Sequence, residues 1–143
     1  MKNNSVFEYD LGVVGLGYVG LPLAVESANS GLNVVGYDIN SERVEMINNG
    51  NSPIEDISNE ELSKSLERFH STTESKKLSN CRNIVISVPT PLTDYQPDLS
   101  YVINAAKTVG ENLVKNQVVI LESTTYPGTT LSLIHISEPT RQP

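Results

Sequence analysis

Short runs of apolar residues alternate with amphipathic stretches along most of this chain. The apolar runs have the length of buried strands, and the stretches between them carry apolar residues at helical spacing. Strands that alternate with helices in this way favour βαβ units and a parallel sheet that is covered on both faces. The pattern predicts strands over residues 11–14, 33–37, 70–73, 83–88 and 117–121, and helices over residues 18–30, 42–49, 59–69 and 101–113.

Turn residues separate these predicted elements. Gly31 and Gly50 follow the first two helices, at the position where glycine commonly ends a helix in the left-handed conformation. Pro89, Thr90 and Pro91 end the strand over 83–88, because proline has no N–H group to donate to a sheet. Asp98 and Ser100 supply acceptor side chains just before the last predicted helix.

Composition narrows the class of protein. With 143 residues and 38% hydrophobic residues, the chain has the size and apolar content of one globular domain. Its formal net charge of −7 argues against non-specific binding to nucleic acid. A polar N-terminus, the lack of a long apolar run and a single cysteine predict a cytoplasmic protein with no disulfide and no membrane segment.

A glycine-rich motif lies between the first predicted strand and the first predicted helix. Gly15, Gly17 and Gly20 form the pattern G-x-G-x-x-G. In such a strand–turn–helix setting, the first glycine permits a tight turn and the second lets a pyrophosphate approach the backbone. The third lets the helix pack closely on the strand, and the helix N-terminus supplies free N–H groups for the phosphates.

Asp38 supports a dinucleotide-binding interpretation of this motif. It ends the second predicted strand, where an acidic side chain accepts hydrogen bonds from ribose hydroxyls. A carboxylate there would repel the 2′-phosphate of NADP, so we predict NAD as the cofactor. The alternative is a glycine turn beside a helix-capping aspartate, and it leaves the order of strand, glycines, helix and acid unexplained. We therefore predict an α/β fold of the Rossmann type, a doubly wound parallel sheet.

Two further segments follow predicted strands at the same, carboxyl edge of the sheet. Thr90 offers a hydroxyl between two prolines, and a plain rigid turn is an equally good interpretation. Ser123, Thr124 and Thr125 follow the last strand, where their hydroxyls would orient a nicotinamide or a water, or would cap the next helix. The residues alone leave these alternatives open.

The other reactive side chains form no catalytic or metal site in the sequence pattern. Cys81 precedes its predicted strand, so we expect it at the amino edge, away from the glycine motif. His70 has no evident partner, and we interpret it as a surface or packing histidine. No group of histidines and cysteines has metal-ligand spacing, and no nucleophile–base–acid set can be assembled.

Six blocks of this sequence resemble the UDP-sugar 6-dehydrogenases. The blocks follow in order from about residue 11 to residue 130. In the last block, the glutamate before Ser-Thr and the Tyr-Pro-Gly after it resemble UDP-N-acetylglucosamine and UDP-N-acetylmannosamine dehydrogenases more than UDP-glucose dehydrogenase. The blocks are GLGYVGLPLA at 15–24, GYDIN at 36–40, SPIED at 52–56, VPTPL at 88–92, PDLSYV at 97–102 and LESTTYPGTT at 121–130.

The resemblance implies an NAD-dependent, two-step oxidation of a UDP-sugar C6 alcohol to a carboxylate for polysaccharide biosynthesis, in a homo-oligomeric enzyme. It implies that Asp38 holds the adenosine ribose, that Arg43 contacts the adenosine side, and that Thr124 positions the nicotinamide and a catalytic water. Thr124 is thus the implied catalytic residue. The implied cofactor-binding residues are Gly15, Gly17, Tyr18, Val19, Gly20, Asp38, Arg43, Thr90 and Thr124.

The stretch LSLIHISEPTR at 131–141 resembles a translated sequencing adapter. We therefore expect a partial NAD-binding domain over 1–130, truncated at its C-terminal end, and a non-native tail over 131–143. The resemblance implies that the family's nucleophilic cysteine and UDP-binding domain lie beyond this chain, so we expect the chain alone to be inactive. The alternative function is a non-catalytic module that senses NAD or another nucleotide, which would need no hydroxyl cluster after the last strand.

Overall fold

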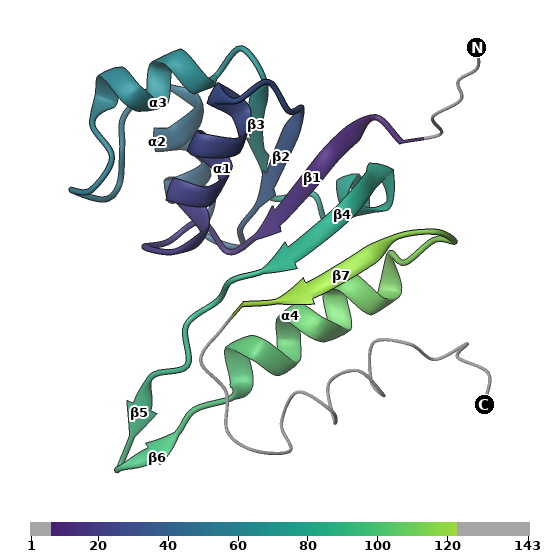
Figure 1. Ribbon diagram of the computed structural model, residues 1–143. Coiled ribbons are helices and arrows are strands. Elements are labelled where there is room, and N and C mark those ends of the chain that lie inside the picture. Colours follow the sequence, from purple (N-terminus) through teal and green to yellow (C-terminus); the bar gives the residue numbers. More distant parts are fainter. Residues whose placement is uncertain (1–6, 123–143) are drawn as a thin grey trace.

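The computed structural model describes residues 7–122, and this part of the chain forms a five-stranded parallel sheet with helices on both faces (Figure 1). The strand order β3-β2-β1-β4-β7 confirms the predicted doubly wound sheet. The strands are β1 (Tyr9–Val14), β2 (Val34–Tyr37), β3 (Phe69–Thr72), β4 (Cys81–Ile86) and β7 (Val118–Leu121). The helices are α1 (Gly20–Asn29), α2 (Ser41–Asn48), α3 (Asn59–Ser65) and α4 (Ser100–Glu111), with a short 3-10 helix, η1 (Ser75–Asn80).

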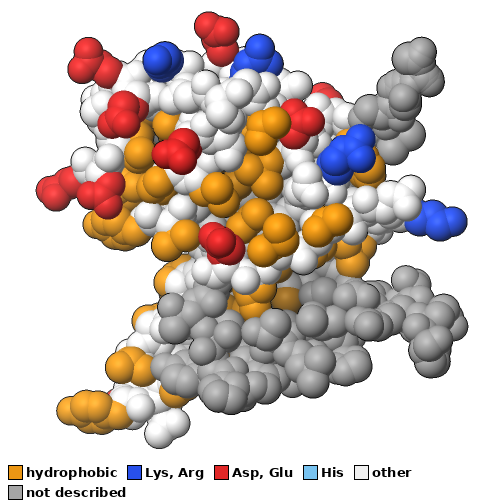
Figure 2. All heavy atoms as spheres, in the orientation of Figure 1, with side chains coloured by type: hydrophobic (Ala, Val, Ile, Leu, Met, Phe, Trp, Pro, Cys, Tyr) orange, Lys and Arg blue, Asp and Glu red, His pale blue; other side chains and the backbone are white. Residues whose placement is uncertain are grey.

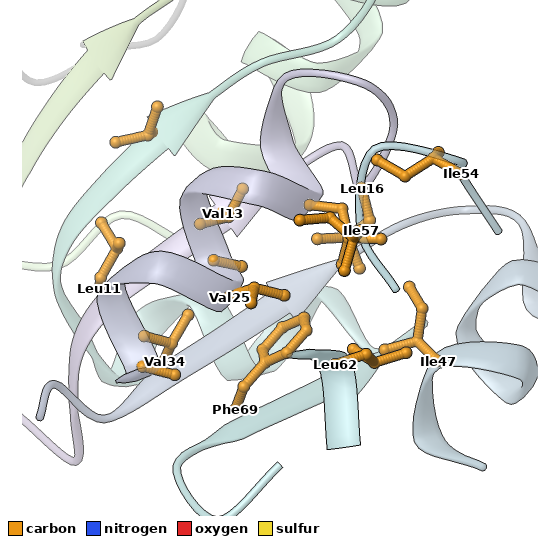
Figure 3. Close-up of a cluster of buried hydrophobic side chains, with 14 residues drawn as sticks. Leu11, Val13, Leu16, Val25, Val34, Ile47, Ile54, Ile57, Leu62 and Phe69 are labelled. Atoms are coloured by element: carbon orange, nitrogen blue, oxygen red, sulfur yellow. The ribbon is translucent and has the colours of Figure 1, made fainter. Parts of the chain in front are cut away.

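Each face of the sheet has its own apolar core, because successive strand residues point to opposite faces. Leu11 and Val13 of β1 pack toward the layer of α1, α2 and α3, whereas Val14 packs on the opposite face with residues of α4 and η1. In Figure 3, the ring of Phe69 lies between Val34 and Leu62 in the core of the first face. Burial on both faces explains why the strands are almost continuous apolar runs.

The helix ends follow local sequence signals. The Asn40 side chain accepts a hydrogen bond of 3.0 Å from the Arg43 N–H and so caps α2. Gly31 and Gly50 have φ values of +110° and +82° just after α1 and α2, as predicted. Glycine adopts this left-handed conformation without the steric penalty of a side chain. These signals fix where α2 begins and where both helices end.

The segment between α3 and β4 departs from the predicted pattern. We predicted a helix that continued through Phe69, but α3 ends at Ser65 and Phe69 begins β3. The apolar spacing of Leu62, Leu66 and Phe69 is also compatible with a helix followed by a strand, and burial of Phe69 against α1 and β2 decides between the two. Helix η1 was not predicted, because its six polar-rich residues carry no apolar periodicity.

A two-stranded antiparallel hairpin, β5 (Leu92–Thr93) and β6 (Gln96–Pro97), projects from the end of β4 and was not predicted (Figure 1). Its turn residues Asp94 and Tyr95 have φ values of +53° and +63°, as a two-residue hairpin of type I′ requires. The hairpin tip is exposed, with Tyr95 95% accessible.

The surface shows no concentration of basic side chains on the face in Figure 2, where acidic side chains are spread over the layer of α1, α2 and α3. Within residues 7–122, no helix is long and apolar enough to cross a membrane.

Candidate functional site

The glycine motif lies at the carboxyl edge of the sheet, where β1 and β4 run side by side. The two strands pair in parallel, with Val14 opposite Ile86. A Cβ placed on Gly15 would lie 2.8 Å from the Ser87 carbonyl oxygen, so the motif contacts the segment that leads from β4 to Thr90. The predicted placement of residues 15–20 and the Pro-Thr-Pro segment at one edge is therefore confirmed. This is also where the strand order reverses, the usual location of ligands in open α/β sheets.

Two glycines of the motif are required by the packing of the chain on itself. Gly15 has a φ of +99°, and its N–H donates a 2.8 Å hydrogen bond to the Tyr37 carbonyl of β2. A Cβ on Gly20 would collide with the Gly15 carbonyl oxygen and would lie 2.5 Å from Ser87 Oγ. The absence of side chains at these two positions lets α1 begin directly against the ends of β1 and β4.

Gly17 differs from its neighbours in the motif because nothing packs closely against it. A Cβ at this position would meet Arg43 Nη1 at 3.9 Å, an ordinary van der Waals distance. Tyr18 and Val19, the next residues, are 72% and 54% exposed. The N-cap residue Val19 makes no side-chain capping bond to α1. An open stretch of backbone and a helix N-terminus without a side-chain cap therefore face the same space, and such an arrangement favours an anionic ligand.

Asp38 follows β2 at this edge and is 7% exposed. Its Oδ2 accepts a 2.8 Å hydrogen bond from the Leu16 N–H in the glycine motif, and its Oδ1 accepts a 2.9 Å bond from the Asn40 N–H. The bond to Leu16 joins residues far apart in the sequence, so sequence reasoning missed it. Because a carboxylate oxygen can accept two hydrogen bonds, Oδ1 retains capacity for a further donor such as a hydroxyl.

Arg43 brings a positive charge to the same location. Its Nη1 lies 3.4 Å from Asp38 Oδ2, and the two side chains are 36% and 8% exposed, respectively. The cap at Asn40 starts α2 immediately after Asp38, and this start places Arg43 within reach of the carboxylate. The guanidinium therefore lies on the solvent side of the carboxylate, next to the open backbone of Gly17.

The remaining predicted site residues, Thr90 and Thr124, follow β4 and β7 in the sequence. Thr90 is partly buried after β4. Thr124 and its neighbouring hydroxyls lie outside the described residues. The last described residue, Glu122, donates from its N–H to the Ile86 carbonyl at 2.8 Å. The chain thus enters the hydroxyl-bearing segment at the carboxyl edge, and the roles expected of Thr90 and Thr124 stay predictions.

Cys81 and His70 lie away from this site, as expected. Cys81 is the first residue of β4, at the amino edge, and is fully buried. Burial, with a smaller contribution from the charge of Glu8, raises the pKa of its thiol to about 12. His70 is exposed on β3, the strand at the far side of the sheet. Cys81 therefore packs in the core and does not face the glycine motif.

A comparison with known protein families finds one match that spans most of the chain. Residues 9–142 match the UDP-glucose/GDP-mannose dehydrogenase family, NAD binding domain. Residues 131–143 lie outside the described part of the structure, so the expected non-native tail stays a prediction.

Curated relatives support the same assignment. The chain is 43% identical over 127 residues to a UDP-N-acetyl-D-glucosamine 6-dehydrogenase from Salmonella typhi. The aligned region covers 88% of the chain and 29% of that protein. It is 40% identical over 131 residues to a UDP-N-acetyl-D-mannosamine dehydrogenase from Pyrococcus horikoshii, covering 90% of the chain and 31% of that protein. The chain thus spans about three tenths of the length of these relatives.

Solved structures show the same fold. The UDP-D-ManNAc dehydrogenase of Pyrococcus horikoshii superposes with a TM-score of 0.85 at 40% identity, covering 90% of this chain and 32% of that one. A ternary complex of GDP-mannose dehydrogenase from Pseudomonas aeruginosa gives a TM-score of 0.85 at 29% identity, covering 91% of this chain and 32% of that one.

Proposed function

This chain belongs to the UDP-glucose/GDP-mannose dehydrogenase family, and we propose that it forms the NAD-binding part of an enzyme that oxidises the C6 alcohol of a UDP-sugar to a carboxylate. The observation that carries the proposal is the combination of an open Gly17 backbone, the uncapped start of α1 and the buried Asp38 carboxylate at one sheet edge. The family match favours this function over a module that only senses nucleotides.

The described residues fit a dinucleotide in their chemistry. The N-terminus of α1 and the backbone at Gly17 suit the negative diphosphate, which needs N–H donors and close approach. Asp38 Oδ1 suits the adenosine ribose, whose hydroxyls are donors. We assign Tyr18 and Val19, which are exposed beside this backbone, to the lining of the diphosphate site. The positive N-terminus of α1 thus matches the diphosphate of NAD, and the Asp38 carboxylate matches the adenosine ribose.

The nicotinamide end of the cofactor belongs, in this proposal, on the β4 and β7 side of the edge. Bound NAD supplies the hydride acceptor for the oxidation of C6. Thr90 would contact the cofactor from the Pro-Thr-Pro segment, and Thr124 would position the nicotinamide and a water. The adenosine end, held by Asp38 and Arg43, would then lie over β2, so the cofactor would run across the carboxyl ends of the central strands.

The proposal extends to the protein of which this chain is a part. A UDP-N-acetylhexosamine is the substrate class that we favour, because the relatives at 43% and 40% identity are named for UDP-N-acetyl-D-glucosamine and UDP-N-acetyl-D-mannosamine. A homo-oligomeric state and a cytoplasmic location belong to the same proposal, and so does a role in polysaccharide biosynthesis.

A calorimetric titration of the chain with NAD tests the cofactor assignment. We expect wild type to bind NAD and Gly17→Val to bind at least about tenfold more weakly, because two methyl groups would block the approach of the diphosphate. Gly31→Asn is the control: it changes a glycine at the opposite edge, where a Cβ meets nothing within 4 Å. Because its φ of +110° strains any side chain, circular dichroism first checks that the variant is folded. Equal loss of affinity in both variants, or no binding by wild type, contradicts the assignment.

An activity assay tests the expectation that this chain alone does not oxidise UDP-sugars. A nucleophile must reach the reacting carbon in near-attack geometry, and Cys81 is buried at the amino edge with a pKa of about 12. The chain is incubated with NAD and UDP-N-acetylglucosamine or UDP-glucose while NADH absorbance is followed. Sustained turnover that Cys81→Ser abolishes would show that Cys81 had been wrongly dismissed.

A further inference from the structure

We infer that Ser87 is a positioning residue of the cofactor site, and that its hydroxyl holds the glycine turn in the form that receives the dinucleotide. Ser87 follows β4 directly and is 7% exposed. It lies outside the glycine motif and the Pro-Thr-Pro segment. The inference rests on the proposed function, because it concerns NAD binding at the carboxyl edge. It goes beyond that function by adding a residue that acts through the backbone and not by contact with the cofactor.

The Ser87 hydroxyl connects the end of β4 to the turn that follows β1. Its Oγ donates to the Gly15 carbonyl at 3.2 Å and to the Val14 carbonyl at 3.4 Å. The Val14 carbonyl also accepts the Ser87 N–H at 2.8 Å, so it keeps a donor whatever the side chain at position 87. The contribution that belongs to the hydroxyl alone is therefore its bond to Gly15, the first glycine of the motif.

A second buried side chain holds the other side of the same peptide group. In the peptide that joins Gly15 to Leu16, the carbonyl accepts from Ser87 Oγ and the N–H donates to Asp38 Oδ2 at 2.8 Å. The carbonyl and the N–H of a trans peptide point in opposite directions, so the two side chains hold this peptide from opposite sides. Ser87 follows β4 and Asp38 follows β2, the two strands that flank β1. Both neighbours of β1 thus fix the first peptide of the turn.

This peptide needs fixing because glycine leaves it free to rotate. Gly15 has a φ of +99° and no side chain to restrict it. In the observed orientation, its carbonyl oxygen lies at the start of α1, where a Cβ on Gly20 would collide with it. Without the Ser87 hydroxyl, the peptide is held from one side only. Rotation would then weaken the bond from Leu16 to Asp38 and loosen the carboxylate that we assign to the ribose.

Cofactor titrations of the full 143-residue chain test the inference, with Ser87→Ala and Ser65→Ala compared with wild type. Only molecules with the peptide in the observed orientation bind NAD at full strength, and one hydrogen bond corresponds to an about two- to tenfold change in an equilibrium. We expect Ser87→Ala to bind NAD more weakly by about that factor. Ser65→Ala is the matched control and should bind as wild type does, since Ser65 is also buried and its Oγ donates to the Leu62 carbonyl at 2.6 Å, but within α3.

The outcomes of these titrations separate the inference from the proposed function. Wild-type affinity in Ser87→Ala overturns the inference, and so does an equal loss in Ser65→Ala. A wild type that fails to bind NAD contradicts the proposed function instead. Ser87→Cys, which has a side chain of similar size and a weaker donor, replaces Ser87→Ala if the alanine variant does not fold.

Amide hydrogen exchange of the chain without NAD gives a second measurement, which does not depend on cofactor binding. The Leu16 N–H reports the orientation of the peptide, whereas the Val34 N–H, which donates to the Arg68 carbonyl at 2.8 Å, reports the stability of the sheet. General destabilisation would speed the exchange of both amides alike. In Ser87→Ala we expect the exchange rate to rise more at Leu16 than at Val34, by a factor of about two to ten. An unchanged rate at Leu16, or an equal rise at the two amides, overturns the inference.

Discussion

The two edges of the sheet use the same residue types for different purposes. Gly12 lies inside β1, and a Cβ on it would lie 2.6 Å from Sγ of Cys81, which starts β4 at the amino edge, so this glycine makes room for a buried side chain. At the carboxyl edge, a Cβ on Gly17 would meet nothing closer than 3.9 Å. The protein itself fills the space beside Gly12, whereas the space beside Gly17 is open. A ligand that approaches the backbone requires such an open space.

The aspartates of the two edges show the same contrast. Asp10 accepts the Asn33 N–H at 2.9 Å and so ties the start of β2 to β1. Asp38 accepts two backbone N–H groups and also lies 3.4 Å from the Arg43 guanidinium. A hydrogen-bonded aspartate is therefore not in itself a sign of function. What distinguishes Asp38 is the open backbone and the cation beside it, and this combination occurs at the carboxyl edge.

The largest effect is expected for Gly20→Ala, because Gly20 is closely packed whereas Gly17 of the same motif is open. Its methyl group would collide with the Gly15 carbonyl oxygen, a backbone atom that cannot move without opening the turn. We expect a loss of about 3 kcal/mol in the free energy of unfolding, measured by denaturant titration. A loss below about 0.5 kcal/mol, the range of neutral surface substitutions, would show that the turn is looser than described.

Gly12→Ala tests the packing of Cys81, away from the carboxyl edge, and should cost about 1–3 kcal/mol of stability through overpacking against this side chain. Because Cys81 Sγ is the nearest atom, at 2.6 Å, the double variant Gly12→Ala/Cys81→Ala should recover part of this loss. A double-mutant cycle measured by denaturant unfolding gives the coupling. NAD affinity should stay at the wild-type value throughout. Strict additivity of the two single changes contradicts the contact, and weaker NAD binding contradicts the separation of the two edges.

The smallest effect concerns the pH dependence that Cys81 contributes. Burial raises the pKa of its thiol in the folded chain from the usual 9.0 to about 12. The folded state then holds this proton where the unfolded state has lost it. The contribution to stability is fully present below about pH 9 and is lost as the pH rises toward 12. Above about pH 8, the free energy of unfolding should therefore fall more steeply with pH for wild type than for Cys81→Ala. The same pH dependence in both proteins would exclude a buried neutral thiol.

The parts of this fold that the sequence predicts are those set by local patterns. The glycines and Asp38 could be placed because a strand, a turn, a helix and a second strand each carry a short-range signal. Phe69 could not be assigned correctly, because its apolar spacing fits a helix and its place in the sheet depends on burial against distant elements. The β5–β6 hairpin was missed because its turn places Tyr95 at a positive φ, at the second central position where glycine is the usual residue.

The candidate site divides in the same way. The composition of the site follows from the sequence, but its internal contacts do not. The bond from Leu16 to Asp38 and the approach of Arg43 to Gly17 join separate βα units, and only the packing of those units brings the groups together.

The location of the cofactor site is tested most directly by a two-dimensional NMR titration of the isotope-labelled chain with NAD, with the backbone amides assigned. We predict that the chemical-shift changes concentrate at the carboxyl edge, on the amides of Leu16, Gly17 and Asn40. The amide signals of Leu11 in β1 and of Asn33, just before β2, should not shift, because both residues lie toward the amino edge. Shifts grouped around Asn33 and Cys81, or an absence of shifts at saturating NAD, would contradict the assignment of the carboxyl edge as the cofactor site.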